Sequence, residues 1–256
     1  MYKRKGFTLV ELLAAISIIA LLTSILVPAL DRAKANAREL VCTSRLLQLG
    51  QIWKMYVDDN DGQFMERSCG SGRGAVSWFH CIRKYYYPDL ELILCPMAVR
   101  TPEEAGRNPY MAWENTTDFG EYYKGSYGIN LWVANGGSCA SDPLDFDRLC
   151  WKTPYARGAS YGPLLLCSQW KDMQPHPWDE PPEYESDHWT SGWPDEMRRP
   201  CIRRHAPYHV NVLFLDFSVD KRTIKQLWKL KWYRDWPADD PLPVWPDWMA
   251  DVPEPD

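Results

Sequence analysis

The 256-residue chain is predicted to be an α+β protein, and three observations support this fold class. The segment from Phe7 to Leu30 is apolar with a single charge, which predicts a helix at the amino end. An apolar stripe at helical spacing extends that helix to about Val57. Short β-rich runs separated by turn residues follow it. We therefore expect one long helix packed on an antiparallel β-sheet head with long loops.

The apolar segment 7–30 is long enough to cross a membrane. At about 1.5 Å per residue it reaches roughly 36 Å, which exceeds the thickness of a hydrocarbon core. Residues 1–5 read MYKRK and carry three basic side chains. Three interpretations compete: a secretory signal, a plain membrane anchor, and a short basic leader that is cut off before the helix. No A-x-A-like cleavage site closes the run, which argues against the secretory signal.

The one charge in this segment, Glu11, separates the remaining interpretations. An acidic side chain costs about 2.5–3.5 kcal/mol at the centre of a membrane helix and less near its end, and a plain anchor gains nothing from it. If the chain is cut after Gly6, the new ammonium of Phe7 can neutralise the Glu11 carboxylate, within one helix or between neighbouring subunits. We therefore expect Glu11 to act in assembly.

The string KGFTLVELLAAISIIALL, residues 5–22, resembles the signal of type IV prepilins and type II secretion pseudopilins. The resemblance implies that a prepilin peptidase cleaves between Gly6 and Phe7 and that Phe7 is then N-methylated. It implies a bacterial inner-membrane protein with one span, a cytoplasmic amino terminus and a periplasmic head. Other pilin or pseudopilin subunits become the expected partners, in a periplasmic or extracellular filament.

Pro28 lies near the end of the apolar segment. Proline has no backbone N–H, so the carbonyl of Ser24 loses its helical partner and we expect the helix to loosen or bend there. Pro28 equally fits a marker of the point where the chain leaves the membrane. Both interpretations stay open.

Beyond the membrane, the sequence predicts a helix end and a series of short strands. Cys42, Leu46, Leu49, Trp53 and Tyr56 form the apolar stripe, and DDNDG at 58–62 ends the helix with turn chemistry. Strands are predicted at 92–96, 125–130, 162–167 and 210–219, and a short helix at 223–232. The expected organisation is a leader at 1–6, a long helix at 7–57, a head at 58–232 and a Trp/Pro/Asp-rich, extended tail at 233–256.

Several of these landmarks resemble one branch of the pilin-like proteins. That branch has a Cys-Pro turn, a Ser-Tyr-Gly-x-Asn segment and a histidine spaced before Asn-Val-Leu-Phe-x-Asp-Gly. The matching motif residues here are Cys95, Pro96, His205, Asn211 and Asp216. The chain departs from the pattern in two ways: ten residues rather than nine separate the histidine from the aspartate, and Phe217 replaces the glycine. His205 and Asp216 could form a catalytic pair, but no motif supplies a nucleophile beside them. A structural hydrogen bond is therefore the favoured interpretation. No enzymatic activity is expected.

Composition excludes other function classes. The net charge is −5 and no basic stripe occurs, so no nucleic acid partner is expected. The eight cysteines contain no C-x-x-C pair, and DDNDG is out of register for an EF-hand loop, so no metal and no cofactor are predicted. An even, scattered set of cysteines predicts disulfides outside the cytoplasm, with buried free thiols as the alternative.

Two functions stay open from the sequence. The favoured one is a structural subunit, pilin or pseudopilin, of a type IV pilus-like or type II secretion-like filament. The alternative is a membrane-anchored, extracytoplasmic protein that binds a ligand or carbohydrate and uses the leader only for delivery. A concave cluster of tryptophans and carboxylates in the 172–200 segment would favour binding. Its members would be Trp178, Trp189 and Trp193 with Asp179, Glu180 and Asp187.

Overall fold

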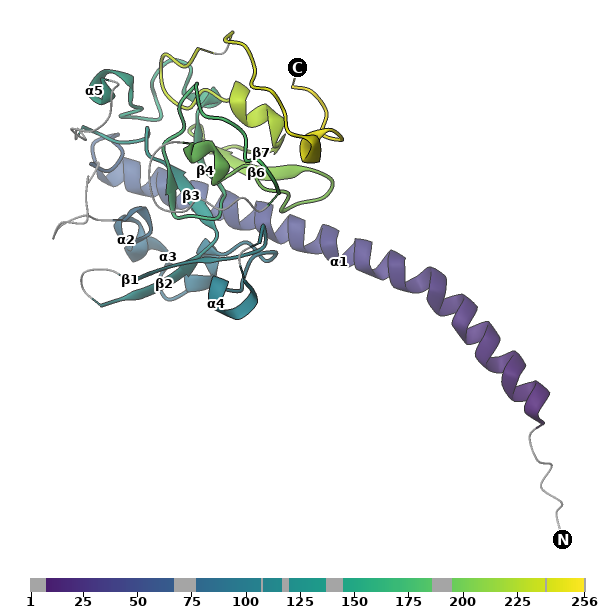
Figure 1. Ribbon diagram of the computed structural model, residues 1–256. Helices are drawn as coiled ribbons and strands as arrows, with labels where there is room; N and C mark the ends of the chain where they lie inside the picture. The colour runs from purple at the N-terminus through teal and green to yellow at the C-terminus, as the bar shows by residue number, and fades with distance from the viewer. Residues whose placement is uncertain are drawn as a thin grey trace. The chain divides into compact units, whose positions relative to one another are not determined.

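The structure is a computed structural model, and it describes residues 8–66, 77–106, 108–116, 120–136, 145–185, 195–237 and 239–255. The chain divides into two compact units, Met1–Leu40 and Val41–Asp256, called here the helical unit and the head unit. Helix α1 (Leu9–Asp59) contributes its first part to the helical unit and its last part to the head unit (Figure 1). The cysteines Cys69 and Cys139 lie outside the described residues.

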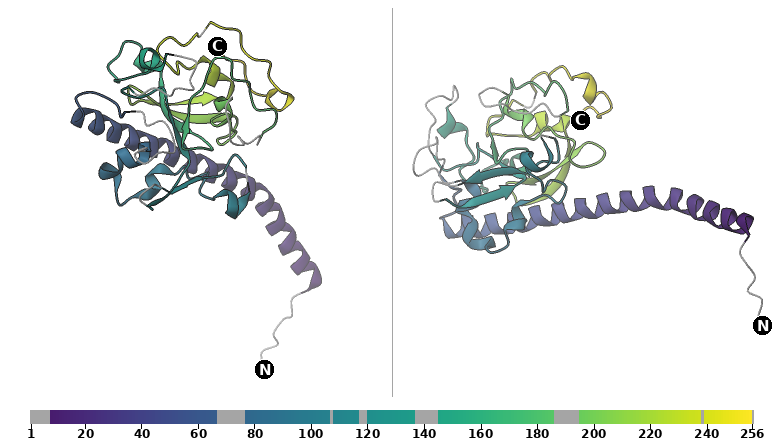
Figure 2. Two further views of the ribbon diagram at one scale, coloured as in Figure 1. Left: turned by 60° about the vertical axis from the view of Figure 1, so that its left-hand side comes forward. Right: turned by 60° about the horizontal axis from the view of Figure 1, so that its bottom comes forward.

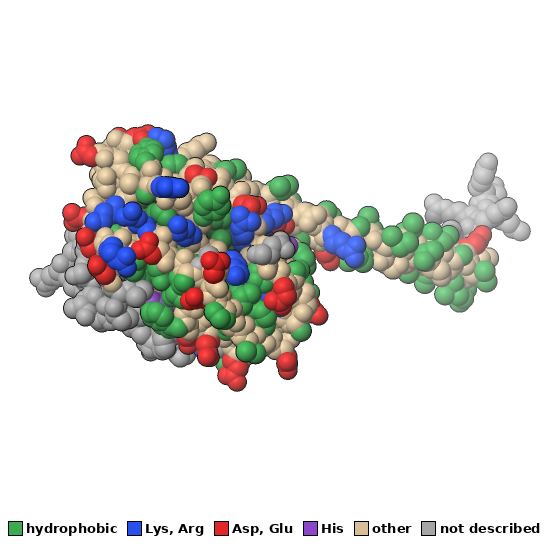
Figure 3. Space-filling view, turned by 90° about the horizontal axis from the view of Figure 1, so that it is seen from above, with side chains coloured by type: hydrophobic (Ala, Val, Ile, Leu, Met, Phe, Trp, Pro, Cys, Tyr) green, Lys and Arg blue, Asp and Glu red, His purple; other side chains and the backbone are tan. Residues whose placement is uncertain are grey.

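In the described residues, the helical unit consists of Thr8 and the first part of α1, up to Leu40. The helix runs without a break through Pro28. It is the one helix in the described ranges that is long and apolar enough to span a membrane, and the most apolar window has a mean hydropathy of 2.5. None of that window is buried. Green apolar side chains accordingly lie along this part of α1 in Figure 3.

In the head unit, α1 buries the predicted stripe. Cys42, Leu46, Leu49 and Trp53 are fully buried, whereas Tyr56 is half-buried. The helix ends at Asp59, two residues beyond the expected end, and the N–H of Gly62 bonds back to the carbonyl of Val57 at 2.9 Å. The DDNDG segment is therefore the helix-ending turn that the sequence predicted.

The head contains a five-stranded sheet and a separate hairpin. The sheet order is β5-β3-β4-β6-β7, and every neighbouring pair is antiparallel except β3 and β5, which run parallel. Figure 2 gives two further views of the head with its strands drawn as arrows. Its strands are β3 (Tyr127–Asn130), β4 (Pro163–Cys167), β5 (Asp172–Met173), β6 (His209–Phe214) and β7 (Val219–Thr223). The hairpin pairs β1 (Trp113–Thr116) with β2 (Tyr122–Gly125). The α+β class with a long amino-terminal helix and a largely antiparallel sheet is confirmed.

Short helical turns connect these strands. They are α2 (Trp78–Cys81), α3 (Arg83–Tyr86), α4 (Pro102–Ala105), α5 (Phe146–Leu149), and the 3-10 helices η1 (Leu90–Ile93), η2 (Ala159–Tyr161), η3 (Glu196–Arg198), η4 (Lys225–Lys229) and η5 (Asp247–Met249). The helix expected at 223–232 is the shorter η4.

Two strand predictions were wrong. The 92–96 run begins inside η1 and ends in a turn; the carbonyl of Ile93 and the N–H of Cys95 both bond to Ser126 rather than to a ladder. A short apolar run does not by itself distinguish a buried strand from a helical turn. The 210–219 run is not one strand but the hairpin of β6 and β7, with a turn between Phe214 and Val219.

Tryptophan side chains hold the irregular parts of the head together. Six are almost completely buried: Trp53, Trp78, Trp113, Trp132, Trp151 and Trp232. Several indole N–H groups donate to backbone carbonyls of distant segments, such as Trp132 to Pro175 at 2.9 Å and Trp151 to Trp232 at 3.1 Å. A large apolar ring with one polar tip can thus fill the core and satisfy a loop carbonyl at the same time.

The tail 233–256 is irregular, as expected, but it is anchored rather than free. Trp236, Met249 and Val252 are buried in the core. The indole N–H of Trp248 donates to the carbonyl of Pro182 at 2.8 Å. The tail is therefore an integral part of the head.

Candidate assembly segment and motif residues

The first turn of α1 is closed by Thr8 and Glu11. The Glu11 carboxylate accepts hydrogen bonds from the backbone N–H and the hydroxyl of Thr8, at 2.9 and 2.7 Å. The Thr8 hydroxyl accepts in turn from the Glu11 N–H at 3.2 Å. This reciprocal arrangement is a capping box. The sequence carries its signature, Thr-x-x-Glu, and the assembly interpretation of Glu11 overlooked it.

The surface of α1 that follows is almost entirely apolar. From Leu9 to Leu30 every large aliphatic side chain is at least half exposed or nearly so, as Val10 (73%) and Leu30 (49%) illustrate. The few hydroxyls on this stretch bond within the helix, as Ser17 does to the carbonyl of Leu13 at 2.8 Å. The segment therefore offers an uncovered apolar surface with its backbone and side-chain polar groups satisfied, as a bilayer or a helical partner requires.

Two motif residues of the head lie together with two other cysteines, which no sequence pattern predicted. Cys95 and His205 meet two further cysteines, Cys42 on α1 and Cys167 at the end of β4. The Nε2 atom of His205 lies 3.5 Å from Cys95 Sγ and 3.4 Å from Cys167 Sγ, and the Sγ atoms of Cys42 and Cys167 are 3.7 Å apart. All four ligand atoms lie within 4.8 Å of one another. We call this group the Cys3His cluster.

The structure shows no disulfide among the described cysteines, and it has the free thiols that were the alternative expectation. All six, Cys42, Cys81, Cys95, Cys150, Cys167 and Cys201, are free. Three of them converge on a histidine instead of pairing with each other, and the other three stand apart from that cluster. Burial raises the pKa of Cys81 to about 11 and that of Cys201 further, so these thiols stay protonated.

The surroundings of the Cys3His cluster are charged as well as buried. Burial raises the pKa of the Cys95 thiol, but hydrogen bonds from Cys167 and Cys42 and the positive charge of Arg204 outweigh it and hold that pKa well below its ordinary value. The Tyr127 hydroxyl donates to Cys42 Sγ at 3.3 Å. The cluster is therefore a site where a thiolate is stabilised in a dry environment.

Arg204, next to the cluster histidine, is fully buried. Its guanidinium donates to three backbone carbonyls, those of Pro109 at 2.8 Å, Ser126 at 2.7 Å and Met111 at 3.0 Å. Among the described residues, these neutral carbonyls, and no carboxylate, are the partners of this guanidinium. The side chain thus ties three loop segments together while it keeps a full positive charge.

His205 and Asp216 do not form a pair. His205 bridges to His209 at the start of β6, whereas Asp216 follows the end of that strand. Six residues of extended chain separate the two ends by roughly 20 Å. Asp216 instead accepts from the N–H and hydroxyl of Ser218, at 3.0 and 2.6 Å, and shapes the β6–β7 turn.

That turn explains why the related motif has a glycine after the aspartate. Phe217 has φ +66°, the left-handed region where glycine is favoured and a bulky residue is strained. Its backbone oxygen lies 3.2 Å from the position that a Cβ on Gly50 of α1 would take, so the turn packs closely on the helix. The departure from glycine leaves the turn geometry in place.

The remaining motif residues lie in the sheet and the Cys-Pro turn. Pro96 follows the cluster residue Cys95 in that turn. Asn211 is buried in β6, and both of its side-chain polar atoms lack a hydrogen-bond partner among the described residues. Asn130 at the end of β3 is satisfied: its amide donates to the carbonyls of Pro163 and Trp232 at 3.0 and 2.8 Å.

Comparison with known proteins agrees with the geometry of the amino-terminal segment. Residues 1–27 match the family described as the prokaryotic N-terminal methylation motif. The chain is type IV pilin-like. It is 43% identical over 61 residues to the type IV wide pilus major component PilA4 of Thermus thermophilus. The match covers 24% of this chain and 47% of the relative, so the chain spans about half the length of that protein. No solved structure matches the chain.

The predicted cleavage residues of the pilin-like chain, Gly6 and Phe7, lie outside the described residues. So do Trp189, Trp193 and Asp187 of the tryptophan-rich segment. The described ring there, Trp178, is half exposed and stacks on His176 with centroids 4.8 Å apart. Its neighbour Asp179 is turned inward and almost fully buried, where it accepts the N–H groups of His176 and Met197. This carboxylate therefore serves the fold and not an exposed binding face.

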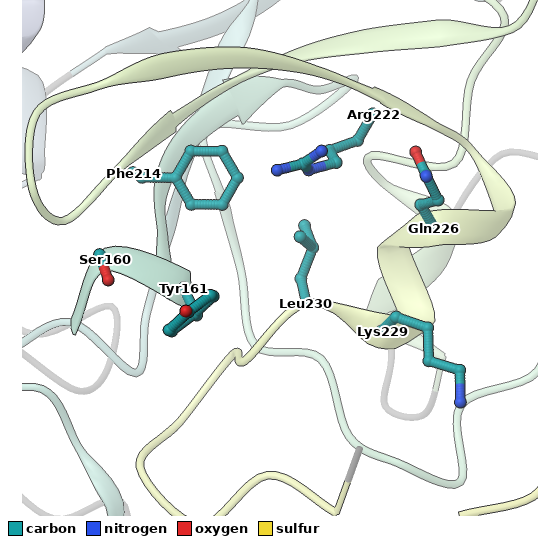
Figure 4. Close-up of a pocket in the computed structure, with 7 residues that line it drawn as sticks. All are labelled: Ser160, Tyr161, Phe214, Arg222, Gln226, Lys229 and Leu230. Carbon is teal, nitrogen blue, oxygen red and sulfur yellow. The ribbon is translucent and has the colours of Figure 1, made fainter. Parts of the chain in front are cut away.

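The head of the pilin-like chain has a small surface hollow between η2, β6 and η4 (Figure 4). Phe214 and Leu230 face it, and the guanidinium of Arg222 lies over the Phe214 ring at 5.3 Å. The hollow encloses about 180 Å³, below the roughly 300 Å³ at which small-molecule sites begin. Its lining residues are Ser160, Tyr161, Phe214, Arg222, Gln226, Lys229 and Leu230.

Proposed function

We propose that the chain is a structural, non-enzymatic subunit of a type IV pilus-like or type II secretion-like filament. In this proposal a prepilin peptidase removes residues 1–6, and the new amino terminus at Phe7 is methylated. The mature helix then anchors the subunit in the bacterial inner membrane, with the head in the periplasm. The observation that carries the proposal is the uncovered apolar surface of α1, most of which lies within the match to the methylation motif.

An uncovered surface of this kind needs an apolar environment. More than a dozen large aliphatic side chains of α1 are exposed, which water disfavours by about 25 cal/mol for each Å² of apolar surface. A bilayer covers this surface before assembly, and the helices of neighbouring subunits cover it afterwards. Packing of apolar helices supplies the contact area for that second state.

Glu11 has two possible roles in this scheme, and the structure allows an experiment that separates them. As part of the capping box, it bonds to Thr8 through groups that a glutamine also supplies. As an assembly residue, it provides a negative charge for the Phe7 ammonium of its own or a neighbouring subunit. We propose the second role in addition to the first.

Filament incorporation of three variants tests this role. Glu11→Gln keeps the cap and removes the charge, Glu11→Ala removes both, and Thr8→Ala weakens the cap but keeps the charge. We expect both Glu11 variants to be inserted and processed yet absent from sheared filaments, with Thr8→Ala incorporated. Normal incorporation of Glu11→Gln would show that the carboxylate serves only the helix end.

Mass spectrometry of the amino terminus tests the processing step. Protein isolated from cells that contain the peptidase should begin at methylated Phe7. Gly6→Leu should leave the precursor uncut, seen as an unshifted band on a gel. Recovery of wild-type protein that still carries residues 1–6 from such cells would overturn the proposal.

The protein's alternative role, a ligand-binding head delivered by the same leader, has less support. Among the described members of the expected cluster, Trp178 and Glu180 are exposed but Asp179 is buried in the fold, and the hollow between η2, β6 and η4 is small. Both observations favour the structural subunit.

A further inference from the structure

The Cys3His cluster has the donor set of a structural metal site. Three cysteines and one histidine form one of the common ligand sets of structural zinc, which is four-coordinate and tetrahedral. All four side chains are buried, and their ligand atoms face a common centre within 4.8 Å of one another. Thiolate and imidazole donors select soft or borderline cations such as Zn²⁺ over calcium or magnesium.

The separations between donor atoms fit a tetrahedron around zinc. With Zn–S distances of about 2.3 Å and Zn–N distances of about 2.0–2.1 Å, the edges are roughly 3.8 Å for S–S and roughly 3.6 Å for S–N. The structure has 3.7 Å between the Sγ atoms of Cys42 and Cys167. It has 3.5 and 3.4 Å from Nε2 of His205 to the Sγ atoms of Cys95 and Cys167. These three of the six edges match the expected lengths, and all six are within 4.8 Å.

The charge of the surroundings fits the same site. Zn²⁺ with three thiolates and a neutral imidazole carries a net charge of −1. The fully buried guanidinium of Arg204, the residue next to His205, donates to three backbone carbonyls, and among the described residues no carboxylate is seen bound to it. A buried cation without a counterion is costly. A zinc centre of charge −1 would supply that counterion.

The four ligands come from four separate segments of the head. Cys42 lies on α1, Cys95 in the turn after η1, Cys167 at the end of β4, and His205 at the bridge that leads into β6. Backbone bonds between His205 and His209, at 3.2 and 2.9 Å, hold the histidine in place. A metal there would join the head part of α1 to the central strand β4 and to the start of its neighbour β6.

We propose that the head unit contains a structural zinc site with the ligands Cys42, Cys95, Cys167 and His205. Binding releases up to three thiol protons to solvent and involves no electron transfer. The site fixes the sheet to the helix and does not depend on the filament proposal. The competing state of the same residues is a disulfide between Cys42 and Cys167, which would leave Cys95 and His205 without a metal.

Metal analysis of the full-length chain tests the site. The untagged chain, purified in detergent from zinc-supplemented cells without chelator, should contain one zinc per chain by inductively coupled plasma mass spectrometry. The reduced, metal-free chain titrated with Co²⁺ should develop visible d–d bands of tetrahedral cobalt and a near-ultraviolet thiolate charge-transfer band, both saturating at one equivalent. This titration needs no variant, so a folding defect cannot obscure it.

Variants then assign the ligands. Cys95→Ala and His205→Ala should lower the zinc content from one per chain to below about a tenth and abolish the cobalt spectrum. Cys201→Ala is the matched control, because Cys201 is buried and free but outside the cluster, and it should keep both.

Two results would overturn the proposal outright, and a third would exclude these ligands. One is a reduced wild-type chain that binds neither zinc nor cobalt. The other is a peptide map of protein from its native compartment that shows Cys42 and Cys167 joined as a disulfide. Equal metal content in the cluster variants and in Cys201→Ala would likewise exclude these four residues as the ligands.

Discussion

Asp179 gives the head a stability that depends on pH. Its carboxyl is 1% exposed, and one oxygen accepts the N–H groups of His176 and Met197, both at 3.1 Å. Burial raises the pKa of Asp179 from 3.8 to about 7; those two hydrogen bonds lower it, and the nearby charges of Asp195 and Glu196 raise it. The folded protein therefore holds this proton more tightly than the unfolded chain does.

The sign and size of the effect follow from this difference in pKa. Stability from Asp179 is fully present below pH 3.8 and is lost as the pH rises to about 7, where the buried carboxyl ionises. The difference between 3.8 and about 7 corresponds to about 4 kcal/mol over the whole titration, at 1.36 kcal/mol per pH unit. Between pH 5 and pH 8 the loss should be about 3 kcal/mol.

Asp179→Asn removes the titration and keeps the size and an acceptor oxygen for the two N–H groups. The assay is guanidinium unfolding of the full chain in detergent, followed by tryptophan fluorescence at pH 5 and pH 8. The free energy of unfolding of the wild type should fall about 3 kcal/mol more than that of the variant. Asp251→Asn, at an exposed position, should behave as the wild type. Parallel pH profiles for the wild type and Asp179→Asn would refute the reasoning.

Three further predictions concern packing and the metal. Leu46→Ala should lower the free energy of unfolding by about 2–5 kcal/mol, because Leu46 is fully buried. Its control Leu47→Ala, at a 45% exposed position, should change that free energy by less than about 0.5 kcal/mol. Equal losses for the two variants in denaturant unfolding would contradict the helix register. Gly125→Ala should lower the free energy of unfolding by at least about 1–3 kcal/mol in the same assay, because its Cβ would lie 2.2 Å from a ring carbon of Trp113. An unchanged denaturation midpoint would contradict this packing. A strong chelator should lower the Tm of the zinc-loaded chain, by ~4–8 °C for each 2 kcal/mol that the metal adds to the free energy of unfolding. An unchanged Tm would contradict a structural role of the metal.

The parts that the sequence predicted correctly are those that local patterns encode. The stripe of Leu46, Leu49 and Trp53 and the turn at Gly62 depend on spacing and turn chemistry within a few residues, and both are where they were expected. The β6–β7 hairpin was missed because Phe217 occupies a left-handed turn position that a glycine would have marked. Without that glycine, the apolar run at 210–219 was predicted to be one strand.

The Cys3His cluster could not be found in the same way. Its contacts join residues 125 and 110 positions apart in the sequence, Cys42 to Cys167 and Cys95 to His205. Short ligand spacings, the usual signature of zinc modules, are absent from such a set. The available signal was indirect: the Cys-Pro turn and the histidine before β6 were both motif residues, and only the fold brings them together.

The bonds between Thr8 and Glu11 also bear on how firmly a subunit would be held in a filament. The carboxylate already has two donors before any cation approaches it, so an incoming ammonium would replace existing bonds or share the oxygen with them. Replacing the Thr8 donors by an ammonium gives a smaller net free energy of association than pairing the ammonium with a carboxylate that has no other donors. If Glu11 has the proposed assembly role, such a contact would align neighbouring subunits and would still be reversible.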